Sequence, residues 1–174
     1  MNLDIMKEYM SSEIRPCIVC GEKNFEVFAQ KSYLVANRCK KCGMISTNPY
    51  FTEAGVKFLY SEYLSNRLTD GELEEKRKTM YDIDRDWVLN YIQYGSILDI
   101  GSSAGYFLSR FDPMNFVRHG IEFSDECRVK AKQLFNIPVR IGNVVDMDFN
   151  TTYDLIMLRG VIEHFIDPVS VIDK

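Results

Sequence analysis

The stretch Ser96-Ile-Leu-Asp-Ile-Gly-Ser-Ser-Ala-Gly105 decides the fold. Its apolar half is short and is stopped by glycine, which predicts a buried strand followed by a tight turn. Strand and helix then alternate about every 20 residues, which indicates βαβ units in an α/β domain with a parallel sheet. Further strands are expected at Val117 to Phe123, Val139 to Val145 and Tyr153 to Leu158, with helices at Ala104 to Phe111, Asp125 to Phe135 and from Val161 onward.

The turn after the first strand carries an acid, Asp99, two residues before Gly101. A dinucleotide fingerprint would need glycine at positions 101, 103 and 106, but Ser103 and Tyr106 stand at two of them. A Walker A loop is also excluded, because no Gly-Lys-Ser or Gly-Lys-Thr follows. Such a turn brings backbone N–H groups close to a ligand, and a carboxylate at its mouth suits a ligand that bears a cation.

Upstream of this domain, four cysteines form two C-x-x-C pairs, and a glycine follows each pair. The pairs are Cys17-Ile-Val-Cys20 and Cys39-Lys-Lys-Cys42, with 18 residues between them. Two such knuckles can place four thiolates around one tetrahedral Zn²⁺, which predicts a closed, structural zinc ribbon. Redox-active or unrelated thiols are the alternative.

The region between the two cysteine pairs and the first strand is expected to be helical. Thr52 is a candidate N-cap, and a helical run opens at Glu53. A long amphipathic helix is expected from Glu72 to Tyr94, with its apolar positions at Met80, Ile83, Trp87, Tyr91 and Tyr94. The expected organisation is therefore a zinc ribbon at 1–50, a helical linker or lid at 51–95, and the α/β domain at 96–174.

Composition excludes several classes of protein. The 174 residues carry a net charge of −4 and are 46% hydrophobic, which argues against disorder and against a general nucleic-acid binder. No apolar run approaches the roughly 18 residues that span a bilayer, and the first ten residues do not form a secretory signal. We therefore expect a cytoplasmic protein without a membrane partner. Five cations of the ribbon segment could face RNA, but a solvated surface is the favoured interpretation: Lys23, Lys31, Arg38, Lys40 and Lys41.

Four segments together resemble a known family. Asp99-Ile-Gly-Ser-Ser-Ala-Gly105 resembles motif I of the class I S-adenosylmethionine-dependent methyltransferases. Gly120-Ile-Glu-Phe-Ser124, Gly142-Asn-Val144 and the segment from Tyr153 to Pro168 resemble its later motifs, in the family's order. The resemblance implies S-adenosylmethionine as cofactor and a Rossmann-like sheet. At about four strands the sheet would be incomplete, so a truncated chain that lacks the last three strands of the family is expected.

The resemblance also implies roles for single residues. Asp99 and the turn would hold the methionine end, Glu122 the ribose hydroxyls, and Asn143 the adenine, while Arg159 would contact either the cofactor carboxylate or an acidic substrate. His164 is the better candidate for a general base, and Tyr60 and Tyr63 could close as a lid. The expected cofactor-binding residues are Asp99, Gly101, Ser102, Ser103, Gly105, Tyr106, Phe107, Glu122, Phe123, Asn143, Val144 and Arg159.

The N-terminal part resembles a subset of the same family, in which a cysteine ribbon and a Tyr-rich helix precede the methyltransferase domain. Cys42-Gly-Met-Ile-Ser-Thr-Asn-Pro49 and Leu59-Tyr-Ser-Glu-Tyr63 carry this resemblance. It implies a small-molecule acceptor, with a sugar or nucleotide-sugar of polysaccharide biosynthesis favoured. A ribosomal-RNA methyltransferase and a cofactor-binding protein without turnover are the rival interpretations. An exposed edge of the incomplete sheet could pair with a second copy to form a homodimer.

Overall fold

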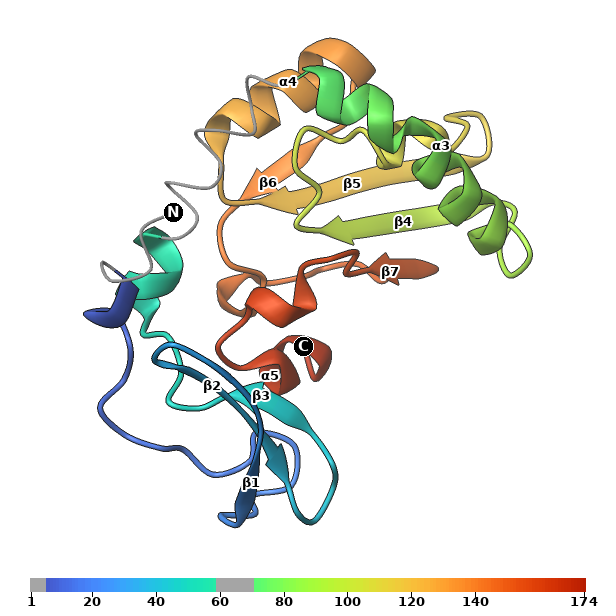
Figure 1. Ribbon diagram of the computed structural model, residues 1–174. Coiled ribbons are helices and arrows are strands. Elements are labelled where there is room, and N and C mark those ends of the chain that lie inside the picture. The colour runs from blue at the N-terminus through green and yellow to red at the C-terminus, as the bar shows by residue number, and fades with distance from the viewer. Residues whose placement is uncertain (1–5, 59–70) are drawn as a thin grey trace. The chain divides into compact units, whose positions relative to one another are not determined.

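The computed structural model of the protein describes residues 6–58 and 71–174 (Figure 1). They fold into two compact units. Residues 6–58 and His164–Asp173 belong to the first, and residues 71–163 and Lys174 to the second. The segment His164–Asp173 therefore packs with the N-terminal part of the chain, although it follows the last strand of the second unit. None of the described helices has the length and apolarity that a membrane crossing requires.

The first unit is built on a three-stranded antiparallel sheet, β1-β2-β3. Its strands are β1 (Phe25–Lys31), β2 (Leu34–Cys39) and β3 (Ile45–Thr47). Phe25 lies opposite Cys39, and Ala36 opposite Thr47. The expected N-cap at Thr52 is confirmed, because its Oγ1 accepts the N–H of Gly55 at 3.2 Å and residues 53–58 are helical. Tyr60 and Tyr63, the expected lid, lie outside the described residues.

A buried asparagine connects three segments of this unit. The Asn48 side chain, only 2% exposed, accepts the Arg15 N–H at 3.2 Å and donates to the Arg15 carbonyl at 2.9 Å. Its own carbonyl accepts Nδ2 of Asn37 at 2.6 Å. Arg15, held in this way, stacks over Tyr50 and donates from Nη1 to the Ile166 carbonyl at 2.6 Å. The segment that leads into the short helix α5 (Pro168–Ile172) is thereby attached to the ribbon.

The second unit contains a four-stranded parallel sheet, as expected. Its strands are β4 (Gly95–Ile100), β5 (Phe116–Glu122), β6 (Val139–Ile141) and β7 (Leu155–Met157), in the order β6-β5-β4-β7. Asp99 of β4 lies opposite Gly120 of β5 on one side and Met157 of β7 on the other. The chain moves to one side of β4 for two strands and then returns to its other side, so β4 and β7 flank the point where the strand order reverses.

The helices agree only in part with the sequence pattern. Helix α4 (Asp125–Phe135) has the expected bounds, with Ser124 as its N-cap. The helix expected at Ala104 to Phe111 is wrong: only a 3₁₀ turn, η1 (Leu108–Arg110), forms there, after a turn with left-handed residues. The last two strands are shorter than expected. Strand β6 ends at Ile141 because Gly142 has a φ of +136° and the 3₁₀ turn η2 (Val144–Asp146) follows, and β7 covers only Leu155–Met157.

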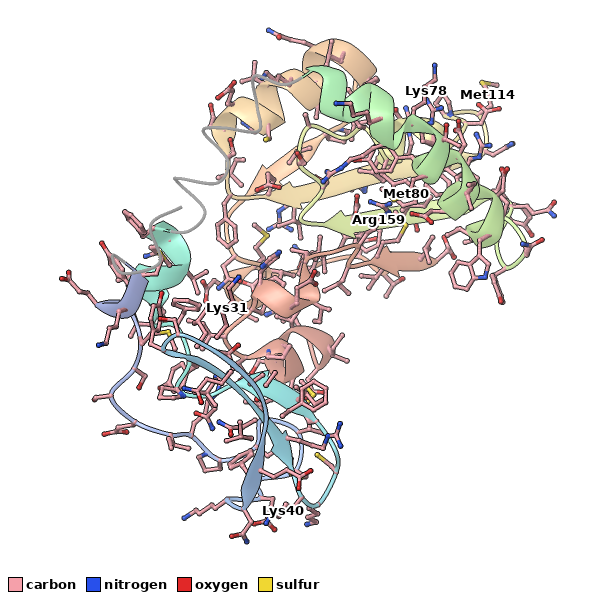
Figure 2. The ribbon with its side chains drawn as sticks, in the orientation of Figure 1. Lys31, Lys40, Lys78, Met80, Met114 and Arg159 are labelled. Atoms are coloured by element: carbon pink, nitrogen blue, oxygen red, sulfur yellow. The ribbon has the colours of Figure 1, made fainter. Side chains whose placement is uncertain are left out.

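Helix α3 (Gly71–Val88) ends earlier than expected and packs through a different face. The apolar residues expected to define the buried face are exposed, 62% in the case of Trp87. Figure 2 labels one of them, Met80, on this helix. The face that packs against the sheet instead contains Tyr81 and Val88, which join Ile97, Phe107 and other residues of β4 to β7, η1 and α4 in one core.

Candidate functional site

The turn after β4 depends on three residues with left-handed backbone. Gly101, Ser103 and Gly105 have φ of +76°, +50° and +77°. Glycine adopts this region readily, whereas serine is strained there. The N–H groups of Gly101 and Ser102 both donate to the Ile121 carbonyl, at 2.8 and 3.1 Å. The turn is therefore anchored at the carboxyl ends of β4 and β5, which we call the carboxyl edge of the sheet.

Two of these positions also need glycine for space. A Cβ on Gly101 would lie 2.5 Å from Val161 Cγ2, and a Cβ on Gly105 would lie 3.3 Å from the Cβ of Ala131 on α4. The turn thus packs closely against α4 and against the segment that follows β7. The hydroxyl of Ser102, by contrast, is buried against β5 and has no hydrogen-bond partner in the described part of the chain.

The two aromatic residues after the turn face the inside of the domain. Tyr106 is half-buried and packs edge-on against Phe135 of α4, with ring centroids 5.2 Å apart. Phe107 is only 6% exposed and lies in the core, in contact with Phe111 and Tyr81. The structure therefore places Phe107 behind the turn, as part of its packed support.

Glu122 at the end of β5 joins this strand to the turn. The residue is 8% exposed, and its carboxylate accepts the Ser103 N–H at 2.9 Å on one oxygen and the Phe123 N–H at 2.7 Å on the other. A carboxylate oxygen can accept about two hydrogen bonds, so each still has an acceptor position. The Phe123 side chain beside it is 55% exposed. This arrangement suits a ligand with two neighbouring hydroxyls and a flat apolar group.

Asp99 is the most strongly perturbed group at this edge. Its side chain is almost fully buried, and no hydrogen bond to its carboxylate is found among the described residues. Burial raises the pKa of Asp99 to about 7, while the charge of Arg159 lowers it and that of Glu122 raises it. A buried carboxylate without a donor is stabilised by a cation placed against it. The site therefore fits a ligand that carries an ammonium group.

Arg159, just beyond β7, is held by helix α3 (Figure 2). Its Nε and Nη2 donate to one oxygen of Asp84, at 2.8 and 2.5 Å. Its guanidinium lies 4.7 Å from the ring centroid of Tyr81 and 5.0 Å from that of Phe107. Sequence reasoning missed Asp84, because an acid among the many charges of a helix carries no local signal of a partner 75 residues later.

The segment after β6 also reaches this edge. The Gly142 N–H donates to the Glu122 carbonyl at 3.0 Å, and Asn143 caps the turn η2, its Oδ1 accepting the Val145 N–H at 3.4 Å. Val144 is buried. Asn143 is half-buried and lies one residue from the contact to Glu122.

His164, the expected general base, belongs to the other unit. It is the last residue of the 3₁₀ turn η3 (Ile162–His164), its side chain is exposed, and it belongs to the ribbon unit. The residues that the structure brings together at the sheet edge are therefore Asp99, Ser103, Glu122 and Arg159, with the turn backbone between them.

The four cysteines of the ribbon unit come together as the spacing predicts. All four sulfurs lie within 4.8 Å of one another, and the pairs Cys17–Cys42 and Cys20–Cys39 are each 3.6 Å apart. Thiolates about 2.3 Å from a tetrahedral Zn²⁺ would be roughly 3.8 Å from each other, so the cluster has the size of a zinc site.

The two knuckles have the same backbone geometry. Cys17 and Cys39 each donate an N–H to the carbonyl five residues later, at 2.8 Å in both, and each accepts the N–H of the glycine four residues later. These glycines have φ of +72° and +77°.

The pKa values of two of the thiols are shifted. The N–H groups of Cys42 and Lys41 lower the pKa of Cys39 to about 7, despite its burial. At Cys20 the Glu22 N–H lowers the pKa of the thiol, but burial and the other three thiols raise it, so that the pKa is about 12. Four thiolates this close together would repel one another, so all four sulfurs can be deprotonated only when a dication is bound between them.

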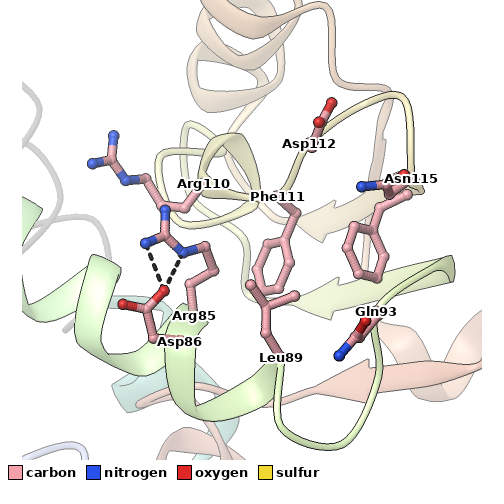
Figure 3. A pocket seen from close by; sticks show the side chains of 9 residues that line it. Arg85, Asp86, Leu89, Gln93, Arg110, Phe111, Asp112 and Asn115 are labelled. Carbon is pink, nitrogen blue, oxygen red and sulfur yellow. Dashed lines mark hydrogen bonds and ion pairs between the residues drawn. The ribbon is translucent and has the colours of Figure 1, made fainter.

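A cavity of about 410 Å³ in the second unit lies away from these residues (Figure 3). It is bordered by the end of α3 and by the loop that leads into β5, so it faces the amino ends of the strands. Its arginines are already paired: Arg85 binds Asp86 at 2.6 Å, and Arg110 binds Asp82. We do not assign the chemistry of the domain to this cavity.

The sequence profile of a family described as "Methyltransferase domain" matches residues 60–174. The chain belongs to this methyltransferase family. No curated protein matches the chain by sequence. The turn after β4 and the acid at the end of β5 thus lie within the methyltransferase domain.

Among solved structures, the plantazolicin methyltransferase BpumL, in complex with a monoazolic desmethylPZN analog and SAH, is 19% identical with a TM-score of 0.51. The match covers 68% of this chain and 50% of BpumL. A candidate S-adenosyl-L-methionine-dependent methyltransferase from Methanococcus maripaludis is 23% identical, with a TM-score of 0.49 and coverage of 59% and 53%. The BpumL likeness supports the fold of the domain. The chain spans about half the length of these structures.

Proposed function

We propose that the methyltransferase domain binds S-adenosylmethionine at the carboxyl edge of β4 and β5 and transfers its methyl group to a small-molecule acceptor. The observation that carries this proposal is the buried Asp99 carboxylate, which lacks a hydrogen-bond donor in the described part of the chain and lies beside a left-handed turn. The ammonium group of the cofactor's methionine end would supply the cation that stabilises this carboxylate.

Each residue at the carboxyl ends of the strands would bind a different part of the cofactor. When bound, the cofactor would supply an electrophilic methyl group on its sulfonium sulfur. The nucleophile of the acceptor would attack the methyl carbon in line as the S–C bond breaks, so that S-adenosylhomocysteine leaves and the acceptor's proton passes to a base or to water. Asp99 would bind the amino group, the turn from Gly101 to Gly105 would approach the methionine end, and Glu122 would accept the ribose hydroxyls. Phe123 would cover the adenine, and Asn143 with Val144 would border it. The role of these residues is to bind, orient and exclude water.

Calorimetry with S-adenosylhomocysteine tests the proposal directly. The protein should bind this ligand with about one site per chain, and Asp99→Ala should lose most of the affinity. Asp112→Asn, at the opposite edge of the sheet, is the matched control and should bind as the unaltered protein does. Absence of binding by the unaltered protein would refute the proposal.

For the acceptor, we favour a sugar or nucleotide-sugar over RNA. One of the five ribbon cations is engaged within the ribbon itself: Arg38 is stacked over Phe28, 4.7 Å from its ring centroid, and lies 3.9 Å from a carboxylate oxygen of Glu26. A general base, if the acceptor hydroxyl needs one, would be His164. Binding to RNA that falls steeply with salt would favour the ribosomal alternative instead. Cofactor binding without methylation of any sugar or RNA substrate would favour the protein without turnover.

We also propose that the ribbon binds one structural Zn²⁺ through Cys17, Cys20, Cys39 and Cys42. The size of the cluster and the repeated knuckle geometry support this. All four ligands come from the protein, so the metal would hold the fold and leave no open position for a substrate. Elemental analysis should find about one zinc per chain.

We also propose a cytoplasmic location and a homodimer. All five cysteines are unpaired, which suits a reducing compartment such as the cytoplasm. Strand β7 is an edge of the described sheet, so it could pair with a second copy. Sedimentation analysis would distinguish a monomer from such a homodimer.

A further inference from the structure

We propose that Asp84 of helix α3 is a positioning residue, which holds Arg159 so that its free N–H groups bind the carboxylate of the cofactor's methionine end. This inference rests on the proposed function, since it concerns the same ligand. The proposal adds Asp84 of α3 to the site. It also names a binding partner, Arg159, for the carboxylate at the amino-acid end of the cofactor.

The guanidinium of Arg159 has unused hydrogen-bond donors. A guanidinium carries five N–H donors in a planar fork. Two of them are used, on Nε and Nη2, and both bind the same oxygen of Asp84. No other hydrogen bond from Arg159 is found in the part of the chain that the structure describes. Three donors therefore remain for an anion, in an arrangement that matches a carboxylate.

The orientation of Arg159 is set on more than one side. Tyr81 and Phe107, both buried, lie under the guanidinium at 4.7 and 5.0 Å, while Asp84 fixes its edge. The Arg159 side chain keeps 29% exposure and that of Asp84 41%. An exposed ion pair of this kind contributes little to stability. Its clearer effect is to fix the direction of a long side chain that would otherwise be free to move.

The placement of charges fits an amino acid. Asp99 of β4 lies opposite Met157 of β7, two residues before Arg159, and the charge of Arg159 lowers the pKa of Asp99. A ligand with an ammonium and a carboxylate on one carbon would satisfy the buried acid with one group and the free guanidinium edge with the other. The pair Asp99 and Arg159 is thus complementary to a zwitterion, and Asp84 fixes the guanidinium of Arg159 on one side.

Two ligands separate this role from a general structural one. S-adenosylhomocysteine carries the amino-acid end, whereas 5′-methylthioadenosine has the same nucleoside without it. Asp84→Asn should weaken binding of S-adenosylhomocysteine about five- to tenfold, as expected for the loss of one well-oriented charged contact, and should leave binding of methylthioadenosine within about twofold. Asp86→Asn, at an exposed acid on the same helix that is paired with Arg85, is the matched control and should change neither.

A second variant keeps the test independent of how Asp84→Asn folds. Arg159→Lys keeps the charge but loses the planar fork, and it should show the same selective loss. The double variant should lose no more than Arg159→Lys alone, because both changes remove one interaction. An equal loss for both ligands, or unchanged binding of S-adenosylhomocysteine in Asp84→Asn, would overturn the proposal. If the unaltered protein bound neither ligand, the proposed function itself would fail.

Discussion

Replacing Ser103 with glycine should stabilise the protein, because this serine is held in the left-handed region. Its φ is +50°, between two glycines that share the same sign of φ. For a residue with a Cβ, the left-handed region costs roughly 1–2 kcal/mol relative to the right-handed one. Glycine has no such cost, so the substitution relieves strain within the turn itself.

The substitution removes little else. The Ser103 N–H that donates to Glu122 at 2.9 Å belongs to the backbone and stays. The hydroxyl is 3.9 Å from the Cys127 sulfur, which is a weak contact. Glycine also makes the unfolded chain more flexible, which offsets roughly 0.5–1 kcal/mol of the gain. We expect a net stabilisation of about 0.5–1 kcal/mol, or a rise in Tm of about 1–4 °C.

Thermal unfolding followed by circular dichroism, at fixed protein and zinc concentrations, measures this shift. Gly101→Ala is the matched control in the same turn: it should lower Tm, because the new Cβ would lie 2.5 Å from Val161 Cγ2 and the φ of this residue is positive. A drop in Tm for Ser103→Gly as large as that for Gly101→Ala would refute the strain argument.

Three further substitutions test the electrostatics, the hydrogen bonds and the metal. Because burial raises the pKa of Asp99 from 3.8 to about 7, the folded state favours its protonated form, and the stability it contributes at low pH is lost as the pH rises through about 7. Urea unfolding of the ligand-free protein should show this decline, and Asp99→Asn should flatten it; an unchanged slope would contradict the assignment. Glu122→Ala leaves two N–H groups without their acceptor and should reduce the free energy of unfolding by about 1–3 kcal/mol, whereas exposed Glu126→Ala should have little effect. Cys39→Ser should lower the zinc content measured by elemental analysis well below that of the Cys127→Ser control, and equal contents would argue against a four-cysteine site.

The sequence allowed prediction of the elements whose signals are local. Strand β4 contains an apolar run that is closed by a glycine, and the bounds of α4 are those expected for the helix at Asp125 to Phe135. The cysteine cluster follows from spacing alone, since each knuckle needs only its own loop.

What could not be predicted depends on contacts between distant segments. The stripe that contains Trp87 has the spacing of a buried face, yet the sheet selects the face with Tyr81 and Val88, because these residues fit against β4 and η1. The turn after β4 stays non-helical because three residues in it adopt positive φ, and serine gives no sign of doing so. Asp84 meets Arg159 only when α3 lies across the sheet.

The hydrogen bond from Arg15 to the Ile166 carbonyl has a consequence for synthesis, because it joins residues 151 positions apart. Both cysteine knuckles leave the ribosome early and need no later residue to bring their sulfurs together. Ile166 follows roughly ten seconds later at ordinary rates of translation. The contacts between Asn48 and Arg15 can therefore form before Ile166 has been synthesised, and the segment after β7 can attach to the ribbon only afterwards.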